Sequence, residues 1–368
     1  MDHTDHTVFE INLNDLEHNL QYLRSKIPGN TLFMGVVKAF AYGNNPVRIA
    51  QKLAALEVDY LAVAYASEGI AIRKAGIQKP ILVFHPQPSN FKDLIDFHLI
   101  PTIYSPLTLT AFIQIAEDRA QTDYPVHLNF NTGMNRLGFS PDKVPDILKK
   151  LKQTRAVKVE GVYSHFAASE DDGERDFGLR QLKVFKETSA RLIENLDYRP
   201  LLHICNTSGI LNFPEAHFDM VRSGIGLYGY GNSVQEDKHL RPIGTLKTTI
   251  LQIHDVKKGE SVGYNREFIA RRASRTATLP FGHADGLTRI YGHGKVNVLV
   301  GGKPAPIIGN VCMDMIMIDV TDIDCREGDE VLIFGKGNSA EKLAHAAGTI
   351  SYELLTAISI RVPRKIIE

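Results

Sequence analysis

Eight short apolar segments in the first two-thirds of the chain constrain most strongly what it can fold into. Short strands that are apolar on both faces are typical of a parallel sheet covered by helices. Eight of them close a (β/α)8 barrel, and an open doubly wound sheet is the alternative. The segments lie near residues 31–37, 60–64, 81–85, 100–104, 126–130, 159–164, 201–204 and 219–222. Apolar residues three and four positions apart predict helices between them at 46–56, 67–75, 90–99, 107–120, 142–154 and 177–196.

The pattern changes near Arg241. From Thr245 onward, glycine-containing turns separate short strands such as 296–300 and 315–320, which is typical of an antiparallel β domain. A helix is expected at 340–347 and a final strand at 358–362. The sequence therefore predicts a TIM-like barrel over residues 1–240 and a mainly antiparallel β domain over 241–368. Residues 8–13 are a candidate strand of this second domain.

Composition excludes several classes of function. The 368 residues hold 42 basic and 42 acidic side chains, without a basic stripe, which argues against nucleic-acid and membrane-surface partners. The 3 cysteines are too few and too scattered for a disulfide framework or a metal site, and they suggest a reducing compartment. No apolar run is long enough to span a membrane, and the polar N-terminus does not resemble a secretory signal. We expect a cytoplasmic protein.

Two candidate functional residues follow predicted strands. Lys38 ends the first apolar run, within VVKAFAYG at 36–43. Apolar neighbours disfavour its ammonium form, as a lysine that forms a covalent bond to a carbonyl compound requires; a plain surface lysine is the alternative. Arg136 lies in NTGMNRLG at 131–138, after the fifth run, where it can clamp a carboxylate or simply be solvated.

Three further features follow later strands. His165 ends the sixth run, where a histidine packed in the core is the alternative to a catalytic one. Asn206-Thr207-Ser208-Gly209 and Arg222-Ser223-Gly224-Ile225-Gly226 follow the seventh and eighth runs. Barrels frequently bind phosphate in these two loops. In a barrel, all five features converge on one face, which predicts a phosphate-bearing cofactor, a reactive lysine and a carboxylate clamp.

These motifs together resemble alanine racemase, a family of fold-type III pyridoxal phosphate enzymes. The resemblance covers nearly the whole chain. It also includes YSHFA at 163–167, RSGIGLYGY at 222–230, SVGYNREF at 261–268, GNVCMDMIMIDVT at 309–321 and SYELLTAISIRVPR at 351–364. It implies an isomerase that interconverts L- and D-alanine with pyridoxal 5'-phosphate and supplies D-alanine for peptidoglycan.

The resemblance implies a homodimer with shared active sites. Lys38 matches the lysine that carries the cofactor and acts as base towards D-alanine. Tyr264 matches the opposite base, towards L-alanine, which reaches the site from the partner subunit, as does the backbone of Met313. Arg136 matches the residue that orients the substrate carboxylate and the tyrosine, and His165 is expected to join that network. The remaining cofactor contacts are matched by Tyr42, Asn206, Thr207, Arg222, Gly224, Ile225 and Tyr352, with Arg222 at the pyridine nitrogen.

The chain departs from the family's pattern at several positions. Asn129 replaces a frequent carbamylated lysine that braces the arginine, so an amide or a bound anion such as chloride would have to replace that brace. Phe40 replaces a frequent asparagine, and Asn44-Asn45 a frequent His-Gly. His283 stands where a gate tyrosine is usual, which leaves open a racemase of broader range, for serine or lysine. A fold-type III decarboxylase and a non-catalytic cofactor carrier are weaker alternatives, because Arg222 replaces the decarboxylases' glutamate and carriers lack the domain that bears Tyr264.

Overall fold

The computed structural model describes residues 6–231 and 233–368, and the chain divides into two compact units. The barrel unit comprises Glu17–Ala41 and Pro46–Leu240. The sheet unit comprises Met1–Leu16, Tyr42–Asn45 and Arg241–Glu368. In the described ranges, no helix combines the length and the apolar character that crossing a membrane requires.

The barrel unit contains a nearly closed parallel sheet of eight strands in the order β8-β7-β6-β5-β4-β3-β2-β9. Hydrogen bonds from Asp219 N to Leu202 O (3.1 Å) and from Arg222 N to Cys205 O (3.1 Å) link the two end strands. All eight predicted strands are confirmed, and the TIM-like barrel prevails over the open sheet. The strands are β2 (Leu32–Val36), β3 (Tyr60–Val63), β4 (Ile81–Val83), β5 (Ile100–Ile103), β6 (Tyr124–Asn129), β7 (Val157–Tyr163), β8 (Leu201–His203) and β9 (Met220–Ser223).

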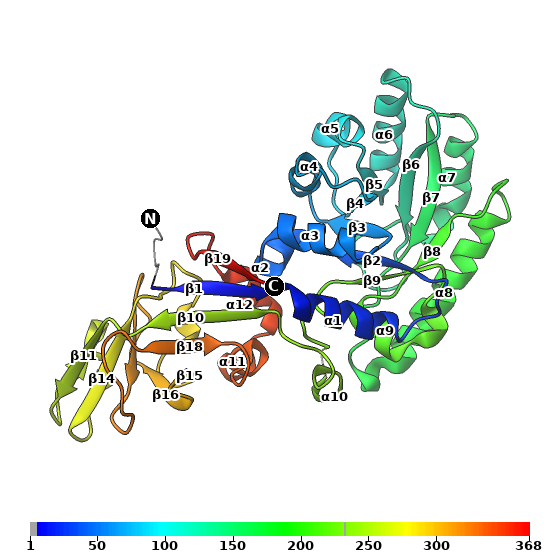
Figure 1. The fold of residues 1–368 in the computed structure, drawn as a ribbon. Helices are drawn as coiled ribbons and strands as arrows, with labels where there is room; N and C mark the ends of the chain where they lie inside the picture. The colour runs from blue at the N-terminus through cyan, green and yellow to red at the C-terminus, as the bar shows by residue number, and fades with distance from the viewer. Residues whose placement is uncertain (1–5, 232) are drawn as a thin grey trace. The chain divides into compact units, whose positions relative to one another are not determined.

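Helices cover the outside of this sheet (Figure 1). They bury one apolar stripe each, as in α8, where Leu182, Phe185 and Leu192 are buried. Local capping sets the helix starts: the Ser105 hydroxyl accepts a hydrogen bond from Thr108 N (3.2 Å), and Pro106 occupies the first turn. The helices are α1 (Leu13–Arg24), α3 (Pro46–Ala55), α4 (Ala66–Lys74), α5 (Phe91–Asp96), α6 (Pro106–Asp118), α7 (Val144–Leu151), α8 (Arg175–Ile193), α9 (Thr207–Asn212) and α10 (Val234–Asp237).

The sheet unit is built on a nine-stranded, mainly antiparallel sheet in the order β11-β14-β17-β16-β15-β18-β10-β1-β19. Strand β1 pairs antiparallel with β10 and parallel with β19, so the chain's first strand lies beside its last. The strands are β1 (Val8–Asn12), β10 (Gly244–Thr249), β11 (Gln252–Val256), β14 (Ser274–Leu279), β15 (Asn297–Val300), β16 (Lys303–Ile308), β17 (Ile316–Asp319), β18 (Glu330–Phe334) and β19 (Arg364–Ile367). A separate pair, β12 (Ser261–Val262) and β13 (Phe268–Ile269), and helices α11 (Ala340–Ala347) and α12 (Ser351–Ala357) complete the unit.

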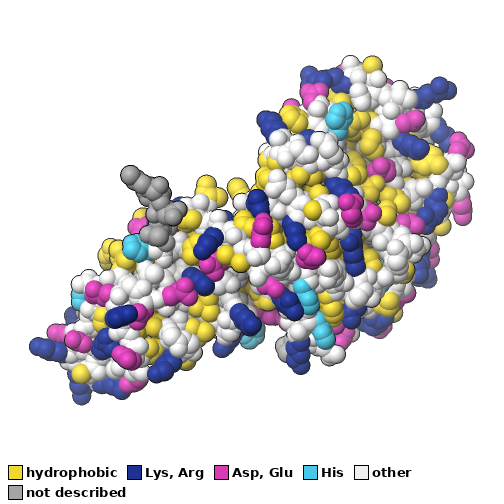
Figure 2. Space-filling view, viewed as in Figure 1, with side chains coloured by type: hydrophobic (Ala, Val, Ile, Leu, Met, Phe, Trp, Pro, Cys, Tyr) yellow, Lys and Arg dark blue, Asp and Glu magenta, His cyan; other side chains and the backbone are white. Residues whose placement is uncertain are grey.

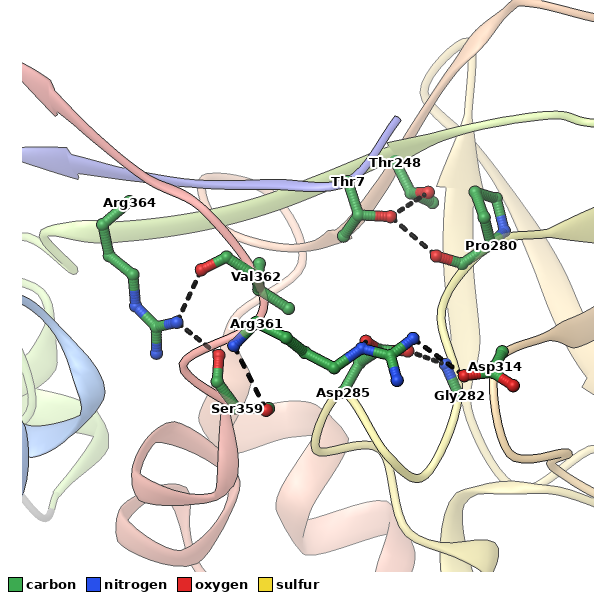
Figure 3. Close-up of polar contacts among 10 residues, drawn as sticks. All are labelled: Thr7, Thr248, Pro280, Gly282, Asp285, Asp314, Ser359, Arg361, Val362 and Arg364. Atoms are coloured by element: carbon green, nitrogen blue, oxygen red, sulfur yellow. Dashed lines mark hydrogen bonds and ion pairs between the residues drawn. The ribbon is translucent and has the colours of Figure 1, made fainter. Parts of the chain in front are cut away.

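The predicted final strand at 358–362 is wrong. The segment is a series of turns, and the last strand is β19. The Arg364 guanidinium donates hydrogen bonds to the carbonyls of Ser359 and Val362 (2.6 Å; Figure 3) and to that of Ile358 (2.7 Å). Apolar residues in this segment suggested a strand, but its carbonyls bond to the Arg364 side chain and, within a turn, to the backbone, as in the bond from Val362 N to Ser359 O (3.1 Å).

Charged side chains of both signs are interspersed on the surface that Figure 2 shows. No large area of a single sign appears on that face. This distribution agrees with the equal numbers of basic and acidic residues in the sequence.

Candidate active site at the carboxyl ends of the barrel strands

A cavity of about 470 Å³ lies where several barrel strands end. Its volume falls within the range of about 300 to 1,000 Å³ that is usual for small-molecule sites. Every lining residue belongs to the barrel unit. The lining brings together three of the predicted site residues, Lys38, Arg136 and His165, with Asn129, His85 and Tyr163.

Lys38 follows strand β2, directly after the buried Val36 and Val37. Burial and then the nearby charge of Arg136 lower the pKa of Lys38, while Glu68 acts in the opposite direction. A lysine reacts as a nucleophile or a base only in its neutral form, so this environment favours reactivity.

The backbone after Lys38 turns in the left-handed sense. Ala39, Phe40, Ala41 and Tyr42 have φ between 51° and 55°, within the short helical segment α2 (Lys38–Gly43). This conformation costs non-glycine residues about 1–2 kcal/mol each. Consecutive strained residues persist only where the surroundings fix them, and they cluster at functional sites.

Arg136 lies on a loop that Asn131 organises. The Asn131 side-chain oxygen accepts hydrogen bonds from Gly133 N (3.1 Å) and Asn135 N (3.0 Å). At Gly138, with φ of 118°, a side chain would place its Cβ 2.5 Å from the backbone nitrogen of Asn131, so only glycine closes the loop. The loop leaves the Arg136 side chain exposed at the cavity.

Arg222, on β9, is buried and contacts two histidines. Its Nη1 donates to Nδ1 of His203 (2.5 Å), and its Nη2 donates to Nδ1 of His165 (3.2 Å) and to the carbonyls of Ser164 (2.8 Å) and Ile204 (3.0 Å). A guanidinium only donates, so both histidines accept at Nδ1 and carry their proton on Nε2. Burial and the neighbouring positive charges hold the pKa of both histidines well below the usual value, so both are neutral.

The hydrogen-bond chain continues across the barrel interior. His203 Nε2 donates to Nδ1 of His127 on β6 (3.0 Å), and His127 Nε2 donates to the Glu160 carboxylate on β7 (3.3 Å). The Tyr163 ring stacks on His203 with a centroid distance of 4.8 Å. Burial raises the pKa of Tyr163 to about 12, which keeps its phenol protonated.

A second polar region lies after β8 and β9. The Asn206 side-chain oxygen caps α9 by accepting a hydrogen bond from Gly209 N (2.8 Å). The Thr207 hydroxyl bonds to Ser223 (2.9 Å) and accepts from Gly226 N (3.3 Å). A Cβ on Gly226 would lie 2.6 Å from the Thr207 side chain, so glycine is needed for this close approach. Gly224 and Ile225 belong to the same loop, which therefore presents hydroxyl groups and backbone N–H groups together.

The other predicted site residues belong to the sheet unit. Tyr264 and Met313 are 74% and 60% exposed. Tyr42 and Tyr352 pack ring against ring, with centroids 6.0 Å apart. The Tyr264 carbonyl accepts a hydrogen bond from the side chain of Asn310 (3.2 Å), which is buried.

Comparison with known proteins decides the family. The family model of the alanine racemase N-terminal domain matches residues 11–232, and the family model of the C-terminal domain matches residues 243–366. The chain belongs to the alanine racemase family. Alanine racemase 1 of Clostridium acetobutylicum is 38% identical over 96% of this chain and 94% of its own length.

Solved members of the alanine racemase family share the fold. That of Clostridium difficile superposes with a TM-score of 0.92 at 35% identity, covering 99% of this chain and 96% of its own. That of Bartonella henselae, solved with covalently bound pyridoxal phosphate, has a TM-score of 0.90 at 27% identity, covering 99% and 100%. By this membership the chain is an enzyme of the racemase class.

Sequence reasoning missed four polar residues of this region, namely His127, Glu160, Tyr163 and His203. Each lies within or at the end of an apolar run, where a polar residue reads as part of a strand. The signal that was available is that His127 and His203 interrupt runs which are otherwise apolar, and a histidine inside a barrel needs polar partners.

Proposed function

We propose that this chain interconverts L- and D-alanine with pyridoxal phosphate bound covalently to Lys38. The observation that carries the proposal is a lysine held towards its neutral form in a cavity shared with Arg136 and His165, in a member of the alanine racemase family. The covalently bound cofactor of the Bartonella henselae alanine racemase supports it.

The environment of Arg222 is a first test of whether the residues present suit this cofactor. Arg222 is 2% exposed, and burial lowers its pKa only to about 10, so it stays charged at neutral pH. Across residues 6–231 and 233–368, no carboxylate forms an ion pair or hydrogen bond with it. A buried cation whose contacts are histidines and carbonyls suits an electron-rich acceptor such as a pyridine nitrogen.

The loops after β8 and β9 suit a phosphate. Hydroxyl and backbone N–H donors gather at Thr207 and Gly226, beside the half-buried Asn206 cap. These are the donors that phosphate groups bind in barrel enzymes. We assign the phosphate contacts to Thr207, Gly224 and Ile225, with Tyr42 and Tyr352 as further ligands and Asn206 as a neighbouring cofactor contact.

Arg222 also limits the reaction type. Bound pyridoxal phosphate acidifies the α-proton of an amino acid by withdrawing electrons. A guanidinium hardly ever gives up its proton, so Arg222 beside the ring nitrogen of a bound cofactor would leave that nitrogen unprotonated. We infer that this weakens electron withdrawal enough to favour simple proton exchange over transamination or decarboxylation.

Racemisation requires a base on each face of the α-carbon. Lys38 serves one face, towards D-alanine. Three tyrosines line the cavity, namely Tyr65, Tyr104 and Tyr163. Tyr104 and Tyr163 are poor candidates for the other face, because burial raises the pKa of both. We assign the second base to Tyr264 of the partner subunit, towards L-alanine.

A shared active site requires a homodimer. Large apolar side chains of the sheet unit stay exposed in the single chain, which is typical of an interaction surface; they include Tyr264, Ile269, Met313, Met315 and Ile350. The backbone of the partner subunit's Met313 would contact substrate. Arg136 would hold the substrate carboxylate through two parallel hydrogen bonds, and the neutral His165 would join this network.

The proposed biological role is to supply D-alanine for peptidoglycan in the cytoplasm. A broader racemase remains a second candidate because His283, at the expected gate position, is exposed. Chiral analysis of products from L-alanine, L-serine and L-lysine separates the two candidates. We expect D-alanine as the main product, and comparable turnover of all three would favour the broader enzyme.

Covalent attachment provides the most direct test of the site. Borohydride reduction of the protein with pyridoxal phosphate, followed by peptide mass spectrometry, should place the label on Lys38. A label on any other lysine would overturn the assignment.

A further inference from the structure

Glu68, the third residue of helix α4, is tied to the backbone beside Lys38. One carboxylate oxygen accepts a hydrogen bond from Ala39 N (2.6 Å). The other accepts from Ala64 N (2.8 Å) and Tyr65 N (3.1 Å). Ala39 follows Lys38 after β2, and Ala64 and Tyr65 follow β3, so one side chain joins the carboxyl ends of neighbouring strands.

Helix capping alone does not account for this arrangement. A cap needs only the bond to Tyr65 N, which lies at the start of α4. The bond to Ala39 reaches 29 residues away in sequence. It ends on the first residue of the left-handed turn, at φ of 53°.

The charges around Lys38 show a second effect of Glu68. The charged and titratable groups that interact with the Lys38 amine are Arg136, His85, His165 and Glu68. Arg136 is a cation, and burial together with nearby positive charges lowers the pKa of His85 and His165, so both are neutral near pH 7. Glu68 is therefore the negative charge of the group.

We propose that Glu68 is a positioning residue for Lys38, which fixes the strained backbone beside the lysine and holds a negative charge near its amine. Charge-assisted hydrogen bonds to backbone N–H groups are about twice as strong as neutral ones, so the carboxylate suits a turn that must be held against strain. This proposal rests on Lys38 as the reactive lysine of the proposed function. Its consequence is that the turn and the protonation of Lys38 depend on one side chain.

Competitive labelling of the full-length chain, freed of pyridoxal phosphate with hydroxylamine, measures the Lys38 amine directly. Trace acetic anhydride reacts only with neutral amines. Labelling as a function of pH therefore gives the pH at which half of the Lys38 amines are neutral, which we call the half-point. In Glu68→Gln the half-point of Lys38 should fall by about one pH unit, because the negative charge that favours the ammonium form is lost. Glu68→Asp keeps the charge, so its half-point should lie close to that of the unaltered chain.

Hydrogen exchange of the same variants measures the turn. Both Glu68→Gln and Glu68→Asp should speed exchange in a peptide spanning 39–42, since neither side chain can make the full set of bonds. Asp59→Asn is the matched control. The Asp59 carboxylate accepts from Phe33 N (2.7 Å) at the amino ends of β2 and β3, about 16 Å of strand away from Lys38. The Asp59→Asn variant should alter neither the Lys38 half-point nor hydrogen exchange at 39–42.

Two results would overturn the proposal. One is a Lys38 half-point that stays unchanged in Glu68→Gln or that moves equally in Asp59→Asn. The other, decisive even if Glu68→Gln fails to fold, is unaltered exchange at 39–42 in Glu68→Asp. Failure of pyridoxal phosphate to attach to Lys38 would refute the proposed function but would leave both measurements interpretable.

Discussion

Arg222 and His203 share a hydrogen bond of 2.5 Å between the guanidinium Nη1 and the imidazole Nδ1, inside the barrel. This bond fixes the direction of the whole series of hydrogen bonds from Arg222 through His203 and His127 to Glu160, since each group donates to the next. Reversal is impossible because arginine cannot accept. This series of hydrogen bonds therefore keeps His203 neutral, with Nδ1 as acceptor. His165 accepts a hydrogen bond from the same guanidinium and is neutral as well.

Two neutral histidines, the buried His203 and the half-buried His165, make stability sensitive to acid. The pKa of His165 and that of His203 lie well below 6.5 in the fold but near 6.5 in the unfolded chain, so below pH 6.5 the unfolded chain binds more protons. The contribution of these two histidines should be constant above this pH, and below it they should together lower the stability by about 2–3 kcal/mol per pH unit. Urea unfolding from pH 7.5 to 5 measures the slope. His203→Gln should lower the slope by about 1.4 kcal/mol per pH unit, and an unchanged slope would contradict a neutral His203.

The barrel was predictable because each of its strands is a short apolar run between helical patterns. The site was predictable only in part. Lys38 and Arg136 stand at strand ends that the sequence marks, so the barrel alone brings them to one face. The left-handed turn at 39–42 could not be foreseen, because no residue preference in Ala-Phe-Ala-Tyr favours positive φ.

Contacts between segments that are distant in the sequence could not be predicted, for a different reason. The bond from Glu68 to Ala39 and that from His203 to His127 depend on which strands are neighbours and in which register. Arg364 shows the same limit, since its guanidinium bonds to carbonyls of the apolar segment 358–362, which forms turns. Local patterns predict elements, whereas these bonds are set by tertiary packing.

Tyr264→Phe should separate the two half-reactions. Removing the phenol removes the proposed base towards L-alanine and leaves Lys38, so α-proton abstraction from L-alanine should fall by about 100-fold or more. Abstraction from D-alanine should fall far less. Exchange of the α-proton in D2O, followed separately from each enantiomer by NMR, measures both rates.

Tyr198→Phe is a matched control for that experiment. The Tyr198 hydroxyl accepts a hydrogen bond from Val159 N (3.0 Å) and is not among the cavity residues. The Tyr198→Phe variant should leave the rates of α-proton exchange from L- and D-alanine unchanged. Equal losses for L- and D-alanine in Tyr264→Phe would refute the two-base scheme.

The proposed bases also predict the pH dependence of activity. Lys38 and a phenol accept protons only in their deprotonated forms, whose populations grow with pH. Burial and Arg136 lower the pKa of Lys38, so its deprotonation is favoured at lower pH than for an ordinary lysine. The initial rate of racemisation should therefore rise from pH 7 towards pH 9. A flat profile between pH 7 and 10 would count against tyrosine as a base.

Asp285 should be the most costly single carboxylate to remove from the sheet unit. It is 5% exposed, accepts a hydrogen bond from Gly282 N (2.8 Å) and pairs with Arg361 (2.8 Å), which also pairs with Asp314 (2.8 Å; Figure 3). Asp285→Ala leaves the buried Gly282 N–H without its acceptor and should destabilise the fold by about 2–3 kcal/mol.

The same substitution should loosen the loop around Met313. The loop at 282–285 holds that residue through the bond from Ala284 N to Met313 O (2.9 Å), so hydrogen exchange near 313 should rise as well. Urea unfolding followed by circular dichroism suits a chain that contains no tryptophan. Asp322→Ala, which breaks only the exposed pair with Arg272, should leave the unfolding midpoint nearly unchanged. If both variants shift the midpoint equally, the contribution of Asp285 does not come from its burial.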